Sequence, residues 1–390
     1  MAANSATLLD ALVAPQLAAL EKAGLRRRLR PADPGLIDVS SNDYLGLSRH
    51  PALVERACAW AQRHGAGSRA ARLVTGTSAE LLALEEQLAR FKGTEAALIF
   101  ATGFQLNSSV LPALLELGND PLVFADRLNH ASLHAGLRGV KQIRFRHNDL
   151  AHLDELLAAN PGAYRLIVTE SVFSMDGDSA DVPALAALAE KHGAFLYLDE
   201  AHATGVLGPQ GKGLAALVSD TAPGRVPVVM GNSGKVPVVM GTLGKALGSA
   251  GAYVAGSRIL IDWIINRCAG FIYSTAPAPA ALGAVEAALE LVPTLDAERA
   301  RLAAMGDALR AALRARDIDT LASSTQIVPA IMGREDAALA AAQRLREAGI
   351  LAIAIRPPTV PPGSARLRFA LSAALTDTQF ERVLAAVAAL

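Results

Sequence analysis

A lysine in a glycine-rich turn and an acidic motif upstream of it are the residues of this chain best suited to covalent chemistry. Lys245 lies in Met240-Gly-Thr-Leu-Gly-Lys-Ala-Leu-Gly248, and Leu198-Asp-Glu-Ala-His202 ends an apolar run earlier in the chain. A lysine amine can bind an aldehyde cofactor as a Schiff base, and a carboxylate such as Asp199 can hold the ring nitrogen of that cofactor protonated. Together they indicate a Schiff-base enzyme.

Other interpretations of the glycines around Lys245 are weaker. A phosphate-binding P-loop needs Gly-x-x-x-x-Gly-Lys-Ser/Thr, but Val239 and Ala246 stand at two of its required positions. No Gly-x-Gly-x-x-Gly follows an expected strand, so a nicotinamide-binding fold has no support. Without Asp199 and His202, Lys245 would be read as a solvated lysine at the end of a loop.

Two histidines have the spacing of a metal-binding pair. His130 and His134 are four residues apart in Asn129-His-Ala-Ser-Leu-His134. No Glu accompanies them as in His-Glu-x-x-His, and no third ligand is evident, so we expect no metal site. One of these rings is better suited to stacking against a flat cofactor.

Three further segments could bind substrate or cofactor, although each is also explained as an ordinary turn or linker. Ala101-Thr-Gly-Phe-Gln105 follows a strand and begins a helix, where backbone N–H groups suit a phosphate. Glu170-Ser-Val-Phe-Ser-Met-Asp-Gly-Asp178 is a polar loop after a buried strand. Ile355-Arg-Pro-Pro-Thr-Val-Pro361 is a stiff segment whose arginine could bind a carboxylate.

The elements that must position these residues alternate between strands and helices. Amphipathic helices are predicted over residues 79–91 and 182–192, and the alternation predicts an α/β fold with a mostly parallel sheet covered on both faces. Ligands of such sheets collect at the carboxyl ends of strands, just after which Gly103, Ser174, Asp199 and His202 stand. The predicted strands are 96–100, 122–124, 142–145, 166–169 and 194–198.

The chain divides into three predicted parts. Residues 1–45 form an N-terminal helix and connector, 46–285 a large cofactor-binding domain, and 286–390 a smaller C-terminal α+β domain rich in alanine helices.

A ten-residue tandem repeat interrupts the pattern. Residues 226–235 and 236–245 differ at only two positions, and one slot in a sheet can take only one copy. We expect the second copy to form the strand, because Ala246-Leu-Gly-Ser-Ala-Gly-Ala-Tyr-Val254 follows it and supplies the next turn and strand. The first copy is then a surface insertion.

Bulk properties exclude several classes of function. Formal net charge is zero, so bulk charge attracts neither nucleic acid nor an anionic membrane. No apolar run reaches the length of a transmembrane helix, and the N-terminus lacks a signal-peptide pattern, so we expect a cytoplasmic protein. Cys58 and Cys268 are expected to be buried, reduced thiols, with a single disulfide as the alternative.

Taken together, these motifs resemble the α-oxoamine synthases, which are pyridoxal-phosphate transferases of fold type I, the aspartate-aminotransferase-like fold. The resemblance runs from Leu25 to about Leu375. It rests on the segments 41–46 (Ser-Asn-Asp-Tyr-Leu-Gly), 129–132, 172–178, 199–202, 241–245, 273–275 and 366–368.

Within this family the segment 355–361 is most similar to members that join L-alanine to a pimeloyl thioester on the way to biotin. They release carbon dioxide and the free thiol carrier, which is coenzyme A (pimeloyl-CoA) or an acyl carrier protein (pimeloyl-acyl carrier protein). The resemblance also implies a homodimer with active sites at its interface.

The resemblance implies a role for each matching residue. Lys245 would bind pyridoxal 5'-phosphate and move the α-proton, Asp199 would pair with the ring nitrogen, and His130 would stack on the ring and touch substrate. The remaining cofactor contacts would be His202, Ser174, Thr242, Gly103 and Phe104, with Ser274 and Thr275 reaching the partner's phosphate. The substrate contacts would be Arg26, Asn42, His130, Arg356 and Thr359.

Two departures and two alternatives remain. Leu81 and Leu375 stand where the family usually has histidine. Other α-oxoamine synthases use glycine or serine, and the Arg-Pro-Pro-Thr stretch at residues 356–359 speaks against them. A non-catalytic scaffold of the same fold is opposed by the retention of Lys245 and Asp199.

Overall fold

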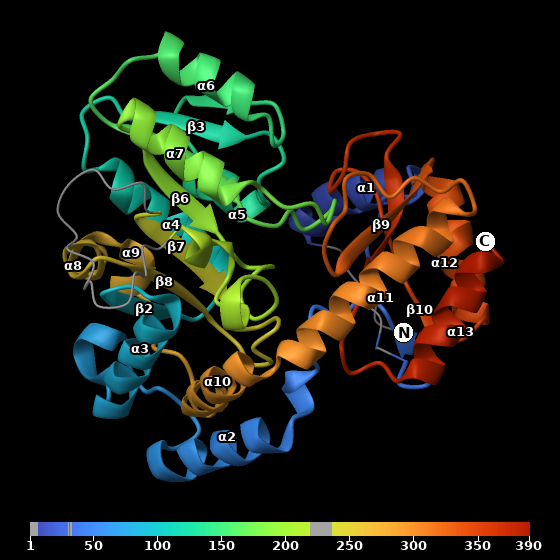
Figure 1. Cartoon of the computed structure of the whole chain (residues 1–390), viewed down its shortest axis with the longest axis horizontal. Helices are drawn as coiled ribbons and strands as arrows, with labels where there is room; N and C mark the ends of the chain where they lie inside the picture. Colours follow the sequence, from blue (N-terminus) through green and yellow to red (C-terminus); the bar gives the residue numbers. More distant parts are fainter. Residues whose placement is uncertain (1–6, 30, 32, 219–235) are drawn as a thin grey trace.

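The computed structural model describes residues 7–29, 31, 33–218 and 236–390 of the chain. Two lobes lie side by side in Figure 1, and the long helix α11 (Asp296–Arg314) extends from one toward the other. The larger lobe is built on a seven-stranded sheet and the smaller on a three-stranded sheet.

The central sheet has the order β2-β8-β7-β6-β5-β3-β4. Only β8 is antiparallel to its neighbours, and all other adjacent pairs are parallel. The expected mostly parallel sheet and the expected strands are confirmed. Its strands are β2 (Ala96–Phe100), β3 (Leu122–Asp126), β4 (Gln142–Phe145), β5 (Arg165–Glu170), β6 (Phe195–Asp199), β7 (Val238–Thr242) and β8 (Ala252–Gly256).

Strand β2 shows why the sheet must be covered on both faces. All five of its residues are buried, and they alternate between two hydrophobic clusters. Leu98 and Phe100 belong to one cluster and Ile99 to the other, since successive side chains of a strand point to opposite faces. A continuous apolar run is therefore stable only between two layers of helices.

Helices from several parts of the chain supply these layers. The predicted helices over 79–91 and 182–192 are confirmed as α3 and α7; Ser78 caps α3 by accepting the Leu81 N–H at 3.1 Å. The helices of the large lobe are α2 (Pro51–His64), α3 (Ala79–Lys92), α4 (Gly103–Leu115), α5 (Ala131–Gly136), α6 (Leu150–Ala159), α7 (Val182–His192), α8 (Arg258–Arg267), α9 (Ala269–Ile272) and α10 (Pro279–Leu291). Short helical turns of other types are Leu47–Arg49, Arg72–Gly76, Pro209–Gly211, Leu214–Leu217 and Val292–Thr294.

The second copy of the tandem repeat forms the strand, as predicted. Strand β7 lies within residues 236–245 and pairs with β6 on one side and β8 on the other. The first copy, residues 226–235, lies outside the described residues. Lys245 consequently follows a strand that neighbours the one ending at Asp199.

The smaller lobe combines the two ends of the chain. Strand β1 (Ile37–Asp38) pairs in parallel with β10 (Ile350–Leu351), so the N-terminal connector joins C-terminal residues. Helix α1 (Leu8–Lys22) lies on this side of the molecule (Figure 1). The other elements are β9 (Ile327–Gly333), β11 (Ile353–Ile355), β12 (Ala365–Ala370), α12 (Glu335–Glu347) and α13 (Asp377–Ala388). The predicted division into three parts remains a prediction. Helix α10 continues through residue 285, the predicted end of the large domain.

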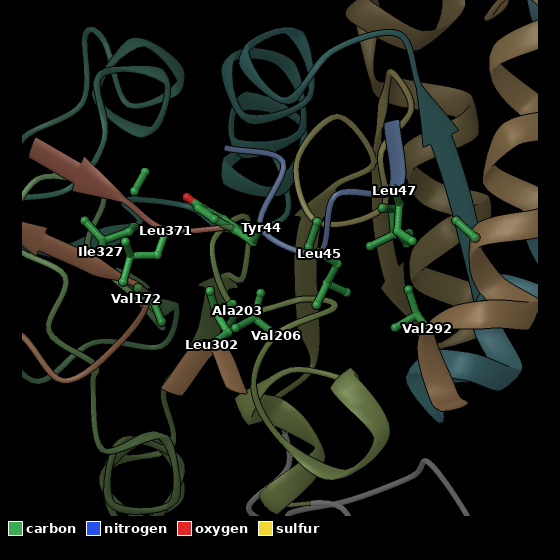
Figure 2. Close-up of a cluster of buried hydrophobic side chains, with 14 of the residues drawn as sticks. Tyr44, Leu45, Leu47, Val172, Ala203, Val206, Val292, Leu302, Ile327 and Leu371 are labelled. Carbon is green, nitrogen blue, oxygen red and sulfur yellow. The ribbon is translucent and has the colours of Figure 1, made fainter. Parts of the chain in front are cut away.

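A hydrophobic cluster ties distant segments together between the lobes. Figure 2 shows Tyr44 among buried side chains of this cluster that come from both lobes, including Ala203 and Leu371. Leu81 and Leu375 are buried in the same cluster, so the two departures from the family pattern act here as core residues. No helix within the described ranges is long and apolar enough to cross a bilayer. Both cysteines are free thiols, as expected, but only Cys268 is buried. The expectation that Cys58 is buried is wrong, because its side chain is exposed on the surface of α2.

Candidate active site

Lys245 is placed by the turn after β7 and faces a histidine. Its Nζ atom lies 2.8 Å from Nε2 of His202, which follows β6 by three residues. Burial lowers the pKa of Lys245 to about 8, although Asp199 and Glu170 favour its charged form. Much of this amine is therefore neutral near pH 8, and a neutral amine is the nucleophilic form.

Asp199 is the last residue of β6 and is held by two hydrogen bonds. The Asn107 amide donates to its Oδ2 atom at 2.9 Å, and the backbone N–H of Ala201 donates to Oδ1 at 2.9 Å. The Tyr197 hydroxyl donates to the amide oxygen of Asn107 at 2.6 Å, which fixes that amide's orientation. Asp199 is buried, yet no salt bridge joins it to a cationic side chain within the described ranges.

Glu170 and His130 complete the polar surroundings. The backbone N–H of His130 donates to the Glu170 carboxyl at 2.5 Å. Burial and the nearby Asp199 charge raise the pKa of Glu170 well above its ordinary value. His130 has a lowered pKa, chiefly because its ring is partly desolvated. Its Nδ1 atom accepts the Ser132 backbone N–H at 3.2 Å, so a neutral His130 carries its proton on Nε2.

A tyrosine and a glutamine hold His202 from the opposite side. The Tyr44 hydroxyl lies 2.6 Å from Nδ1 of His202, and the Gln326 amide donates to the His202 carbonyl at 2.9 Å. Burial lowers the pKa of His202 well below 6.5, and the Lys245 charge lowers it further. His202 is therefore neutral at physiological pH.

Arg368 on β12 brings the smaller lobe into the site. Its Nε donates to the Ser174 carbonyl at 2.5 Å, and its NH2 group donates to Asn42 Oδ1 at 3.2 Å. Its positive charge also lowers the pKa of Lys245 and of His202. A fixed, buried guanidinium beside a reactive amine is suited to binding a carboxylate.

The expected phosphate-binding segment begins α4. The Thr102 side chain caps this helix by accepting the Gln105 N–H at 3.1 Å, so the first N–H groups, at Gly103 and Phe104, have no carbonyl partner within the helix. The Gln105 side chain donates to the Gly270 carbonyl at 2.6 Å and ties this end to α9. Half-buried Ser274 and exposed Thr275 follow α9, and Thr242 ends β7.

Three predicted substrate-binding residues line a cleft that does not include Lys245. Arg26, Arg356 and Thr359 line a cleft of about 690 Å³ between the N-terminal connector, α12 and β11. Arg27, also in its lining, donates to Thr359 at 3.1 Å, and Arg356 donates to the Gly24 carbonyl. No hydrogen bond or ion pair within the described ranges joins these three predicted residues to Lys245.

Several site residues were not predicted from the sequence. Tyr44 and Arg368 lie inside the segments 41–46 and 366–368, on which the family resemblance rests. Their polar side chains within these segments could have marked them as site residues. Asn107 could have been noticed as a polar residue on a helix that is otherwise apolar on its buried face. Glu170 ends β5 at the sheet edge where ligands collect.

Histidines outside this cluster have other roles. His134 faces Gln142, with Nδ1 3.3 Å from its oxygen, and so does not share a partner with His130. His147 lies near Asp176 and Asp178 in the kind of arrangement that can bind a metal. However, its two ring nitrogens contact Asp126 at 3.0 Å and Asp178 at 2.9 Å. Burial alone would lower the His147 pKa, but these two carboxylates raise it to about 10. His147 is therefore protonated at neutral pH and forms ion pairs with Asp126 and Asp178.

The donor set fits pyridoxal phosphate. Asp199 is a buried carboxylate with no salt bridge to a cationic side chain in the described part of the chain, and a protonated ring nitrogen would supply such a partner. Lys245 offers an amine with a lowered pKa, and the start of α4 offers N–H groups for a phosphate. The fold and site therefore define a fold-type-I pyridoxal-phosphate enzyme.

The comparisons agree with this class. Residues 34–387 match the family described as aminotransferase class I and II, and the chain belongs to that family. An 8-amino-7-oxononanoate synthase of Gluconacetobacter diazotrophicus is 55% identical over 94% of this chain and 94% of its own length. The expected fold class, cofactor and acyltransferase class of enzyme are confirmed.

Solved structures show the same fold at lower identity. Serine palmitoyltransferase of Sphingomonas wittichii is 27% identical, with a TM-score of 0.85 over 99% of this chain and 98% of that one. An 8-amino-7-oxononanoate synthase of Francisella tularensis is 26% identical, with a TM-score of 0.75 over 92% of this chain and 98% of that one.

Proposed function

We propose that this chain condenses L-alanine with a pimeloyl thioester, releasing carbon dioxide and the thiol carrier and giving 8-amino-7-oxononanoate. The observation that carries the proposal is the 55% identity, over nearly the full length of both chains, to a relative of that name. The cationic cleft lined by Arg26, Arg356 and Thr359 supports it, because a pimeloyl thioester is a long, anionic substrate.

The cofactor would be held by residues of the larger lobe. Asp199 would pair with the ring nitrogen, His202 would face the ring hydroxyl, and His130 would stack on the ring. Gly103, Phe104, Ser174 and Thr242 would complete the contacts, with Ser274 and Thr275 reaching the phosphate of a partner subunit. When bound, pyridoxal phosphate supplies an aldehyde for the amino group and a ring that accepts an electron pair.

Lys245 would carry the cofactor and then move a proton. Because its pKa is about 8, its Nζ atom can both accept the α-proton of alanine and return a proton later in the reaction. Asp199 favours the charged amine and burial favours the neutral amine, and this balance places the pKa near the working pH.

The remaining residues would orient the two substrates. We assign Arg368 and Asn42 to the carboxylate of L-alanine, since Arg368 is fixed by Ser174 and Asn42 next to Lys245. Arg26, Arg356 and Thr359 would bind the acyl donor, carried by coenzyme A or by an acyl carrier protein. We also propose a homodimer with active sites at its interface, a cytoplasmic location, and the three-part division at residues 45 and 285.

A second candidate is a serine palmitoyltransferase type of activity, which the TM-score of 0.85 favours. A matrix assay separates the two. The chain with pyridoxal phosphate is incubated with L-alanine, glycine or L-serine against pimeloyl-, acetyl-, succinyl- or palmitoyl-CoA, and products are identified by mass spectrometry.

We expect product only from L-alanine and the pimeloyl donor, and a parallel arm with pimeloyl-acyl carrier protein identifies the carrier. Product from L-serine and palmitoyl-CoA would instead establish the second candidate. Absence of product from every pair would favour a non-catalytic scaffold.

A further inference from the structure

The hydrogen bonds around His202 define where its proton sits. Arg368 can only donate, so the Asn42 atom that it contacts at 3.2 Å must be the amide oxygen. The Tyr44 hydroxyl contacts the same oxygen at 3.0 Å and therefore donates its single proton there.

This arrangement leaves Tyr44 only as an acceptor toward His202. The Tyr44 oxygen lies 2.6 Å from Nδ1, and because the Tyr44 proton is donated to Asn42, the proton of this second hydrogen bond comes from the ring nitrogen. A neutral imidazole has one N–H, so Nε2 is then unprotonated and carries a lone pair. Nε2 is the atom that lies 2.8 Å from Lys245 Nζ.

We propose that Tyr44 is a positioning residue that places the His202 proton on Nδ1, so that Nε2 presents a lone pair to Lys245. A neutral lysine amine has two N–H groups and one lone pair. When Nε2 accepts one N–H, the amine's lone pair stays free to attack the aldehyde of the cofactor. In that condensation the C–N bond would form as the C=O bond breaks, and the aldehyde oxygen would leave as water with the two amine protons. In the opposite tautomer Nε2–H would donate to the amine and occupy that lone pair.

His130 provides an internal comparison. Its Nδ1 accepts the Ser132 N–H, so its proton lies on Nε2, the opposite arrangement to His202. Removing the Tyr44 hydroxyl should change His202 and leave His130 unchanged. The inference rests on the proposed function only for its catalytic consequence, since the tautomer is a property of the chain without substrate.

The test is ¹⁵N NMR of histidine-labelled, full-length protein freed of cofactor, with His202 signals assigned by their loss in His202→Asn. Protonated and bare ring nitrogens have well-separated shifts. We expect Nδ1 of His202 to be protonated in the wild type. A wild-type spectrum with Nε2 protonated overturns the proposal without any variant.

Variants then separate positioning from folding. Tyr44→Phe and Asn42→Leu should both move the His202 proton to Nε2, whereas Asn42→Asp, which keeps an acceptor for Tyr44, should not. Tyr164→Phe removes a hydroxyl that donates to the Leu114 carbonyl elsewhere and is the matched control.

The second readout is the rate at which pyridoxal phosphate is captured covalently, measured at high pH where Lys245 is neutral. Tyr44→Phe should slow capture about threefold to tenfold, the range that one neutral hydrogen bond supplies. Unchanged capture with an unchanged tautomer would overturn the proposal. Normal capture combined with failure of every substrate pair would refute the proposed function alone.

Discussion

The Lys245 amine lies 2.8 Å from Nε2 of His202, although the two residues are 43 positions apart in the chain. The contact exists because β6 and β7 are adjacent and parallel, with Asp199 paired to Met240. Their carboxyl ends therefore deliver both side chains to one edge of the sheet.

Lys245→Ala should abolish covalent attachment of pyridoxal phosphate, because Lys245 supplies the amine that lies in this cluster, beside His202. Borohydride reduction followed by peptide mass spectrometry locates the modified lysine. Lys235→Ala, the equivalent position in the first repeat copy, is the control and should leave attachment intact. Modification at residue 235 would contradict the prediction that the second repeat copy, residues 236–245, supplies the cofactor-binding lysine.

Covalent capture of the cofactor should follow the ionisation of Lys245. Only the neutral amine attacks an aldehyde, so the rate should fall about tenfold per pH unit below the pKa of about 8 and reach a plateau above it. Asp199→Asn should move this midpoint to lower pH, since Asp199 favours the charged amine. Stopped-flow absorbance of the cofactor-free protein measures the profile. A midpoint near the ordinary lysine value of 10.5 would refute the buried amine.

Arg368→Met should raise KM for the amino acid by about tenfold or more, because a charge-assisted hydrogen bond contributes about 1.5–3 kcal/mol. Steady-state kinetics with varied L-alanine, at saturating acyl donor, gives this constant. Arg356→Met is the matched control, and its main effect should be on KM for the acyl donor. Equal effects of both variants on both substrates would contradict the assignment of two separate carboxylate partners.

His147→Gln should destabilise the fold at neutral pH. Burial alone would lower the His147 pKa, but hydrogen bonds to Asp126 and Asp178 raise it to about 10. A raised histidine pKa stabilises the folded state fully below the unfolded value of about 6.5, and this contribution is lost as pH rises through 10. We expect a loss on the order of 3 kcal/mol at pH 7, shrinking above pH 10. Urea unfolding at both pH values tests this, and a pH-independent difference would contradict the ion pair.

Much of the fold followed from local patterns. Apolar runs bounded by turn residues identified β2, β3, β5 and β6, because strands buried on both faces are apolar at most positions. Strand β4 lies at the edge of the sheet, and its Arg144 is exposed. Lys245 and Asp199 were also recognisable, since a glycine-flanked lysine and a strand-end carboxylate are unusual enough to indicate chemistry. The family resemblance then supplied contacts such as His202 and Thr242 that composition and spacing alone leave open.

Other features were decided only by the tertiary structure. The two repeat copies are nearly identical, so only pairing with β6 and β8 selects the second copy for the sheet. Arg368 reaches Asn42 across 326 positions, and Tyr44 reaches His202 across 158. Local sequence determines period, caps and turns, whereas such contacts depend on strand register and lobe packing, which join residues that no local pattern connects.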